Sequence, residues 1–352
     1  MFSSKIYNCN LYLWLPCILL YSCFVSGCTH ETLIENTGVY PKAEPGVVPA
    51  WFPEINYPED NQPNSIRIAL GKKFFYEKRF SADTSIACAS CHLPELAFSD
   101  SVAISKGSYG RLGARNAPSL GNVAWQPYLM REGGVSTIEK QALAPFGEHN
   151  EFDLNIVDAL PRIIADTTYQ NLSQQAYQRP LEYYVITRAL AAFERSFITA
   201  GSPFDDYFYR KIPNALGSDA IAGLNLFFSD SLACSKCHSG FDFTNYSFQN
   251  NGLYITYADS GRARLTYLPQ DRALFKVPSL RNIALTAPYM HNGSIKTLNE
   301  VIDHYASGGL PHENKSSLLK GFVITDQQKA QLIAFLQTLT DTQFINYAAY
   351  RE

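Results

Sequence analysis

The sequence predicts a mainly α-helical fold in which two similar modules are joined by long loops. Apolar residues recur at helical spacing in several segments, and no strand-like run exceeds a few residues. A motif of two cysteines and a histidine occurs twice, as CASCH at residues 88–92 and as CSKCH at residues 234–238. The residues that follow the two copies are also similar, which is typical of a duplicated unit.

The composition is that of a globular protein. The 352 residues, 46% of them hydrophobic and 17% charged, are enough for two domains that each bury a core. The formal net charge of −3 excludes the strong basic surface that nucleic-acid binding needs. Small electron-transfer proteins are compatible partners, because they need only local charge complementarity.

The N-terminal residues are typical of a secretory signal, predicted at residues 1–27. Lys5 precedes an apolar run at residues 11–25, which Pro16 interrupts and which is too short to span a membrane. The tetrad VSGC that ends at Cys28 is similar to a bacterial lipobox, which implies lipidation of Cys28. The alternative is ordinary cleavage beside an incidental cysteine. Either way the body is exported, which predicts a location in the periplasm or cell envelope.

The elements follow in order. Residues 28–63 hold six prolines and little periodicity, which predicts a tether or an arm that follows the surface. Helical periodicity precedes each cysteine motif, at residues 66–80 and 220–228. The longest helical pattern covers residues 181–198, and another covers residues 331–339 near the C-terminus.

The similarity between the halves continues after the motifs. NAPSLGNVAWQPYLMREGGVSTIEKQ begins at Asn116, and KVPSLRNIALTAPYMHNGSIKTLNEV begins at Lys276. Pro-Ser-Leu-x-Asn, Pro-Tyr, a glycine and a threonine that opens a helix recur in the same order. We therefore predict two domains related by duplication, at residues 64–203 and 204–352.

Each cysteine motif has the chemistry of a c-type haem attachment site. Two thiols two residues apart form thioethers with the haem vinyl groups, and the next histidine binds the iron. The predicted attachment residues are Cys88, Cys91, His92, Cys234, Cys237 and His238. A zinc ribbon or a redox dithiol is the alternative, but neither needs a histidine after each cysteine pair.

These motifs resemble those of bacterial dihaem cytochrome c peroxidases and their MauG-type relatives. The resemblance runs from about Ala69 to Tyr305 and beyond, through LGKKFFYEKRFS, ARNAPSL, QALAP, ALAAFERS and TLNEVIDHY. It implies two cytochrome c-like domains with two covalently bound haems. It also implies that His92 is the proximal ligand of a peroxide-reacting haem and His238 that of an electron-relay haem.

The sixth position of each iron decides the chemistry, because only an open face binds peroxide. Candidates after the second motif are Met290, His291, His304 and Tyr305. Met290 suits a high-potential relay, but the resemblance implies Tyr305, at the position where classical peroxidases carry methionine and MauG carries tyrosine. Met290 remains the alternative, and Tyr305 would then pack on the haem edge.

The open face of the first haem needs a group that moves a proton between the two peroxide oxygens. FGEHNEFD supplies Glu148, His149, Glu151 and Asp153. The resemblance implies that Glu151 is the catalytic carboxylate. The alternative is a solvated carboxylate in a loop.

The resemblance further implies one calcium ion between the haems, held by the Asn116 side chain and the main-chain oxygens of Thr286 and Pro288. For Asn116, a capping or turn role is the alternative.

Where the family usually has tryptophan between the haems, this chain has Arg131. A guanidinium is no station for electron hopping, and it is suited to haem propionates. Trp125 is a possible substitute or a core residue.

The predicted function is that of an exported peroxidase that reduces hydrogen peroxide to water, with electrons entering at the C-terminal haem from a cytochrome c or a cupredoxin. The first alternative is a MauG-type enzyme that oxidises side chains of a partner protein. The second is a dihaem electron carrier without catalysis. A lipid anchor would attach the chain to a membrane, and a homodimer is compatible with the sequence.

Overall fold

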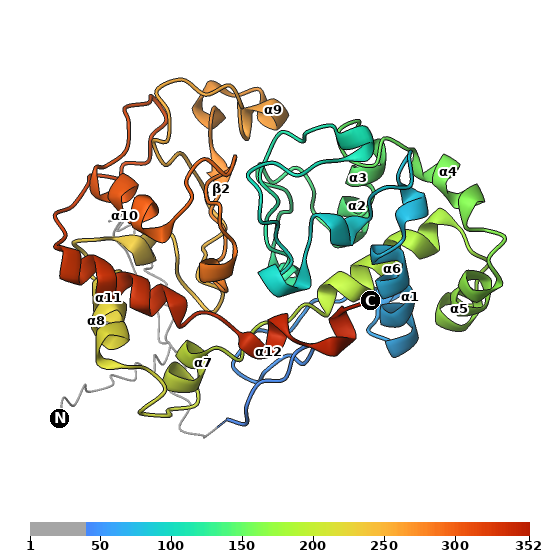
Figure 1. Cartoon of the computed structure of the whole chain (residues 1–352), viewed down its shortest axis with the longest axis horizontal. Helices are drawn as coiled ribbons and strands as arrows, with labels where there is room; N and C mark the ends of the chain where they lie inside the picture. The colour runs from blue at the N-terminus through green and yellow to red at the C-terminus, as the bar shows by residue number, and fades with distance from the viewer. Residues whose placement is uncertain (1–39) are drawn as a thin grey trace, which may run out of the picture. The chain divides into compact units, whose positions relative to one another are not determined.

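The computed structural model describes residues 40–352, and the predicted signal segment and Cys28 lie outside the described residues. The fold is mainly helical, as predicted (Figure 1). The helices are α1 (Ser65–Phe75), α2 (Ile138–Gln141), α3 (Ala144–Gly147), α4 (Ile156–Ala159), α5 (Thr167–Tyr177), α6 (Tyr183–Arg195), α7 (Pro203–Phe208), α8 (Ser218–Phe227), α9 (Ala263–Thr266), α10 (Leu298–Ala306), α11 (Asp326–Gln337) and α12 (Thr342–Ile345). The strands β1 (Phe248–Gln249) and β2 (Phe275–Lys276) form one antiparallel pair. No helix of the described residues has the length and apolar character needed to cross a bilayer.

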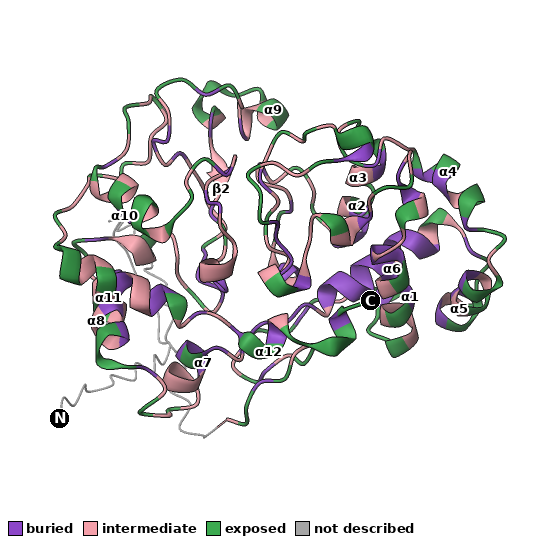
Figure 2. Cartoon of the chain, viewed as in Figure 1, coloured by how far each residue is buried: buried purple, intermediate pink, exposed green. Residues whose placement is uncertain are grey.

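Helices α1 and α6 form the centre of the first half. Asn64 caps α1, because its side chain accepts hydrogen bonds from the backbone N–H groups of Ile66 and Arg67. The two helices touch at Gly71, where a Cβ atom would lie 1.8 Å from the carbonyl oxygen of Ala189. Figure 2 shows that α6 is buried along most of its length, which explains its strongly apolar sequence.

Helices α8 and α11 pack in the same way in the second half. A Cβ atom on Gly223 would lie 1.9 Å from the carbonyl oxygen of Gln331. Phe227 and Phe335 then meet in a second core, with ring centroids 5.1 Å apart. The paired phenylalanines of the two halves differ, because Phe74 and Phe75 are both buried whereas Phe228 is exposed. Gly71 therefore corresponds to Gly223, and Phe75 to Phe227.

The repeated Pro-Ser-Leu-x-Asn segments make matching contacts. Asn122 and Asn282 both adopt left-handed backbone conformations. The N–H of Asn122 donates to Phe197, and its side-chain oxygen accepts from the N–H of Thr199, two residues further on. Asn282 does the same with Leu339 and Asp341. Each asparagine thus fastens its loop to the chain that leaves the long helix of its half.

Two segments link the halves into one compact unit. Beyond α11 the chain crosses to the first half, where Phe344 and Tyr350 are buried in its core. At the other end, the described part of the Pro-rich segment lies against the body: Phe52 packs on Trp125 and Phe241, and the Trp125 indole donates to the carbonyl of Pro53. Trp125 is therefore a packing residue. The domain boundaries at residues 63 and 203 stay a prediction.

Several helix ends differ from the predicted ones, and two of these differences have a clear local cause. Helix α11 begins at Asp326, five residues before the predicted start, because Thr325 and Gln328 form a capping box. Its first turns are polar, so hydrophobic periodicity does not reveal them. Helix α6 ends at Arg195 and not at residue 198, and the N–H of Ser196 bonds back to the carbonyl of Phe193.

Candidate functional site

Both cysteine motifs line one cavity of about 910 Å³. In each motif the first cysteine opens a short 3-10 turn, Cys88–Ser90 or Cys234–Lys236. All four cysteines of the described residues are free thiols. The cavity is also lined by the other predicted site residues of the described chain, which are Asn116, Glu151, Thr286, Pro288, Met290 and Tyr305.

The two motif histidines are oriented alike. His92 Nδ1 lies 2.8 Å from the carbonyl oxygen of Phe98, and His238 Nδ1 lies 3.1 Å from that of Phe243. Phe98 and Phe243 both have positive φ, which turns their carbonyls back toward the imidazoles. Because Nδ1 donates its proton to a carbonyl, Nε2 stays free as the ligating nitrogen. Together with the free thiols and the cavity, this arrangement fits two c-type haems.

Glu151 lies beside the first motif. The Glu151 side chain is exposed on the side that faces the cavity. Protein atoms nevertheless surround the carboxyl, and this burial, with a smaller effect from the negative Glu148, raises the pKa of Glu151 to about 7. The carboxylate is close enough to Cys88 and Cys91 to contribute to the raised pKa of both thiols.

The loop that carries Glu151 is fixed by its neighbours. The N–H of Ser108 donates to the carbonyl of Glu151, and the Ser108 hydroxyl donates to that of Phe152. A Cβ atom on Gly107 would lie 2.1 Å from the carbonyl oxygen of Asn150, so only glycine allows this approach. Asp153 is occupied by an ion pair with Arg111 and by His149, whose Nδ1 lies 2.8 Å away.

Four candidates for the sixth ligand lie near the second motif, and Asn251 links three of them. Its side-chain amide donates to Met290 Sδ at 3.0 Å, and its carbonyl oxygen lies 2.9 Å from His304 Nε2. Burial raises the pKa of Tyr305, with a hydrogen bond to Asn251 opposing and the charges of Cys237 and Cys234 adding to it. Tyr305 thus lies close to both thiols of the second motif.

Packing distinguishes the candidates further. Met290 packs on a hydrophobic cluster that includes Tyr257 and Ala273. His291 is buried and stacks on Phe275, with ring centroids 4.1 Å apart, and burial lowers the pKa of His291 to about 4. His291 and His304 therefore have other partners, and the choice between Tyr305 and Met290 stays a prediction.

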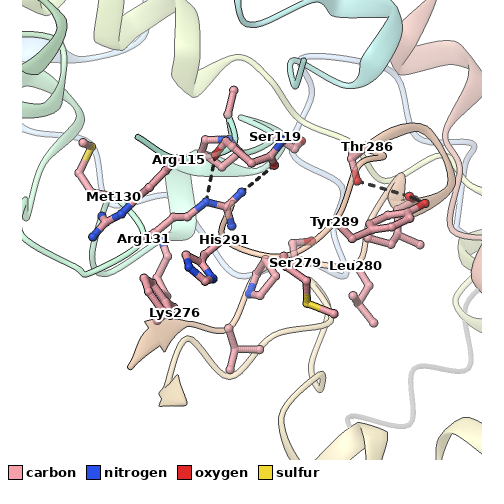
Figure 3. A pocket seen from close by; sticks show the side chains of 18 of the residues that line it. Arg115, Ser119, Met130, Arg131, Lys276, Ser279, Leu280, Thr286, Tyr289 and His291 are labelled. Carbon is pink, nitrogen blue, oxygen red and sulfur yellow. Dashed lines mark hydrogen bonds between the residues drawn. The ribbon is translucent and has the colours of Figure 1, made fainter. Parts of the chain in front are cut away.

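Arg131, labelled in Figure 3, lines the cavity and is hydrogen-bonded to Asn116. Its Nε donates to the Asn116 carbonyl oxygen at 3.0 Å, and its Nη2 donates to Oδ1 at 2.9 Å. Burial, aided by the charge of Arg115, lowers the pKa of Arg131 to about 10, so the guanidinium is still charged at neutral pH. The Asn116 oxygens, one of them the predicted calcium ligand, are thus already bonded to a cation. They do not fit a second one.

Two residues of the site were not predicted from the sequence. Glu194 in α6 is buried in the cavity wall, and burial raises its pKa to about 8. The sequence ALAAFERS could have indicated it, because a carboxylate on the apolar face of a helix is unusual. Its neighbour Arg195 is ion-paired with Glu139. Asn251 gave no signal, because its role depends on contacts with residues about forty to fifty positions away.

Comparison with known proteins agrees with this geometry. The family model for di-haem cytochrome c peroxidase matches residues 65–212. The methylamine utilization protein MauG of Methylorubrum extorquens is 32% identical over 290 residues, which cover 81% of each chain. The cytochrome-c peroxidase IdrP1 of Pseudomonas sp. strain SCT is 31% identical and covers 85% of this chain and 86% of its own.

A solved structure is similar over most of the chain. The crystal structure of a MauG-like protein associated with microbial copper homeostasis has a TM-score of 0.82 and 33% sequence identity, covering 86% of this chain and 97% of its own. Relatives of this identity and coverage, with the matching family model, carry the assignment. The chain belongs to the di-haem cytochrome c peroxidase and MauG family of peroxidase-like oxidoreductases, which implies two c-type haems.

Proposed function

We propose that this protein is an exported peroxidase that reduces hydrogen peroxide to water. The observation that carries the proposal is Glu151, a carboxyl with a pKa of about 7 that lies beside the first motif in the shared cavity. Met290 and Tyr305 line the same cavity and are the candidate sixth ligands of the second haem. One half then offers an acid–base group, and the other offers a closed electron-relay site.

The reaction consumes one peroxide, two electrons and two protons and forms two waters. When bound at the first motif, a haem would supply an iron that can bind peroxide, and the haem at the second motif would relay electrons to it. Glu151 takes a proton from the near oxygen of the peroxide and returns it to the leaving one. The fixed loop around Ser108 keeps the carboxyl in place, and a pKa near 7 allows both steps at neutral pH.

Several finer features belong to the same proposal. The matching asparagine and glycine contacts support duplication of one haem domain, with domains at residues 64–203 and 204–352. The sequence supports a signal peptide at residues 1–27 and a lipid anchor at Cys28 in the cell envelope. The electron donor is a small protein such as a cytochrome c or a cupredoxin. A homodimer is compatible with the proposal.

Tyr305 favours a second candidate, a MauG-type enzyme that oxidises side chains of a partner protein. The tyrosine lies close to the thiols of the second motif, and MauG is among the similar proteins. Arg131 argues against it, because the position between the haems lacks the aromatic ring that charge sharing would use. Peroxide would again be the oxidant, and a protein side chain would supply the electrons.

The experiment is a paired measurement on the purified protein with both haems attached. We expect a high-spin signal from one haem in the resting or half-reduced protein. We also expect peroxide-dependent oxidation of a reduced cytochrome c or cupredoxin. Rapid reaction with peroxide without use of a reduced donor would favour the MauG-type enzyme. Two low-spin haems that do not react with peroxide would refute both and leave an electron carrier.

A further inference from the structure

The inter-haem calcium ion implied by the family resemblance has three assigned ligand residues, which are Asn116, Thr286 and Pro288. All three line the shared cavity. Calcium takes six to eight oxygen ligands at about 2.3–2.6 Å, so the side-chain oxygen of Asn116 would have to face the ion. In this chain that oxygen instead accepts a hydrogen bond from Arg131. Figure 3 labels Arg131 and Thr286 among the residues that line the cavity.

Every polar group of Asn116 is already engaged. Its Oδ1 and its carbonyl oxygen accept hydrogen bonds from Arg131, and its Nδ2 donates to the carbonyl of Val102 at 3.2 Å. Its N–H donates to the carbonyl of His291 in the second half, at 2.9 Å. The bond to Val102 fixes the orientation of the amide, so Oδ1 cannot turn to an ion without losing both contacts.

The charges around Arg131 disfavour a second cation. Arg115 and Lys276 both lie near Arg131: the charge of Arg115 helps to lower the pKa of Arg131, and the charge of Arg131 helps to lower the pKa of Lys276. The carboxylates of Glu132 and Asp259 are both paired with Arg115. A divalent ion on Asn116 Oδ1 would therefore meet a guanidinium at contact distance, with no unpaired carboxylate among these residues to offset the repulsion.

Arg131 also links the halves, as a bridging ion would. Its side chain holds Asn116, which bonds to His291, and its carbonyl oxygen accepts from the N–H of Lys276 at 2.7 Å. We propose that the guanidinium of Arg131 takes the place of the inter-haem calcium ion, so that this chain binds no calcium between its two motifs. This inference concerns cation binding and does not depend on the reaction that the protein catalyses.

The test is a calorimetric titration of CaCl2 into the holoprotein after treatment with EDTA, with melting temperatures measured in CaCl2 and in EDTA. We expect no saturable binding below about 1 mM and the same melting temperature in both. One calcium ion per chain bound with micromolar affinity, with a calcium-dependent rise in melting temperature, would overturn the proposal. The wild-type titration decides this without any variant.

The variant Arg131→Met tests whether Arg131 is the group that prevents calcium binding. It removes the guanidinium and frees both Asn116 oxygens, so we expect one calcium ion to bind and to raise the melting temperature. Arg262→Met is the matched control. Arg262 also donates to this segment, at the carbonyl of Glu132, which follows Arg131 in the sequence, but it does not donate to Asn116. It should remain without calcium binding. Absence of binding in a folded Arg131→Met protein would show that Arg131 does not exclude the ion and would refute the replacement.

Discussion

The environment of Glu151 determines its pKa, and this makes its carboxyl suitable for proton transfer. Glu148 lies three residues away in the same loop and also lines the cavity. Burial raises the pKa of Glu151 to about 7. The sequence supplied four polar candidates in this loop. The structure engages Asp153 and His149 with each other and leaves the two glutamates facing the cavity.

Replacing Glu151 with Gln should slow the reaction with peroxide about 100-fold or more, because the amide cannot accept the proton. The haems should stay attached. In the wild type the rate should fall as the pH drops below about 7, since the carboxyl must be deprotonated to act as a base. Stopped-flow measurements across pH 5 to 9 check both points. A Gln variant with the wild-type rate would exclude Glu151 from the mechanism.

Glu148→Gln is the matched control for this loop. Removal of its negative charge should lower the pKa of Glu151, because the charge contributes to raising it. The midpoint of the pH–rate profile should therefore move to lower pH, with little change in the limiting rate. An upward shift, or a large loss of limiting rate, would contradict the assigned roles.

The second haem can be tested in the same way. Tyr305→Phe removes the hydroxyl, and we expect the second haem to change from six-coordinate to high-spin in the ferric protein. Met290→Leu should leave the spectrum as in the wild type, because Met290 packs in a cluster and accepts from Asn251. Electron paramagnetic resonance separates the outcomes. A sulfur-to-iron band in the reduced protein, lost in Met290→Leu, would assign Met290.

At the scale of elements, the two long helix pairs depend on a glycine at each crossing. Periodicity predicted α1, α6 and α8, although α1 ends five residues before the predicted end. It did not predict which residues touch, because a glycine within a helical pattern looks like a defect until its partner helix is known. Gly71 and Gly223 are the points of closest approach, and both meet backbone carbonyl oxygens that cannot move aside.

Gly71→Ala and Gly223→Ala should each destabilise the protein by about 2 to 3 kcal/mol, because the new methyl group forces the helices apart. Gly147→Ala is the control, since nothing lies within 4 Å of a Cβ atom there and alanine favours the helix. Thermal unfolding of the holoproteins measures the difference. If Gly71→Ala or Gly223→Ala is as stable as Gly147→Ala, the helices can move apart at these crossings without a loss of folding free energy.

At the scale of the whole molecule, the halves share a buried polar junction. Asp341 Oδ2 accepts from the Thr199 hydroxyl and from the N–H groups of Ala200 and Gly201, and its Oδ1 accepts from Phe344. The repeat in the sequence predicted that the halves would be similar. It did not predict this junction, because Asp341 corresponds to Thr199 and only the fold brings the two positions into contact.

Asp341→Ala leaves three N–H groups without their acceptor, two of them buried and one partly buried, and should cost roughly 3 kcal/mol. Because the junction belongs to both halves, the apparent melting temperature should fall in one transition. Asp326→Ala, at the exposed start of α11, should change it little. Two separate transitions in the Asp341 variant would show that the halves unfold independently.

The burial of Phe344 and Tyr350 in the first core has a consequence for folding. Tyr350 contacts Phe98, whose carbonyl holds His92, and the Tyr76 hydroxyl donates to the Tyr350 carbonyl. The first core is therefore complete only once the C-terminal residues, as far as position 350, have folded back onto it. Until then the core around the first attachment motif lacks two of its aromatic side chains.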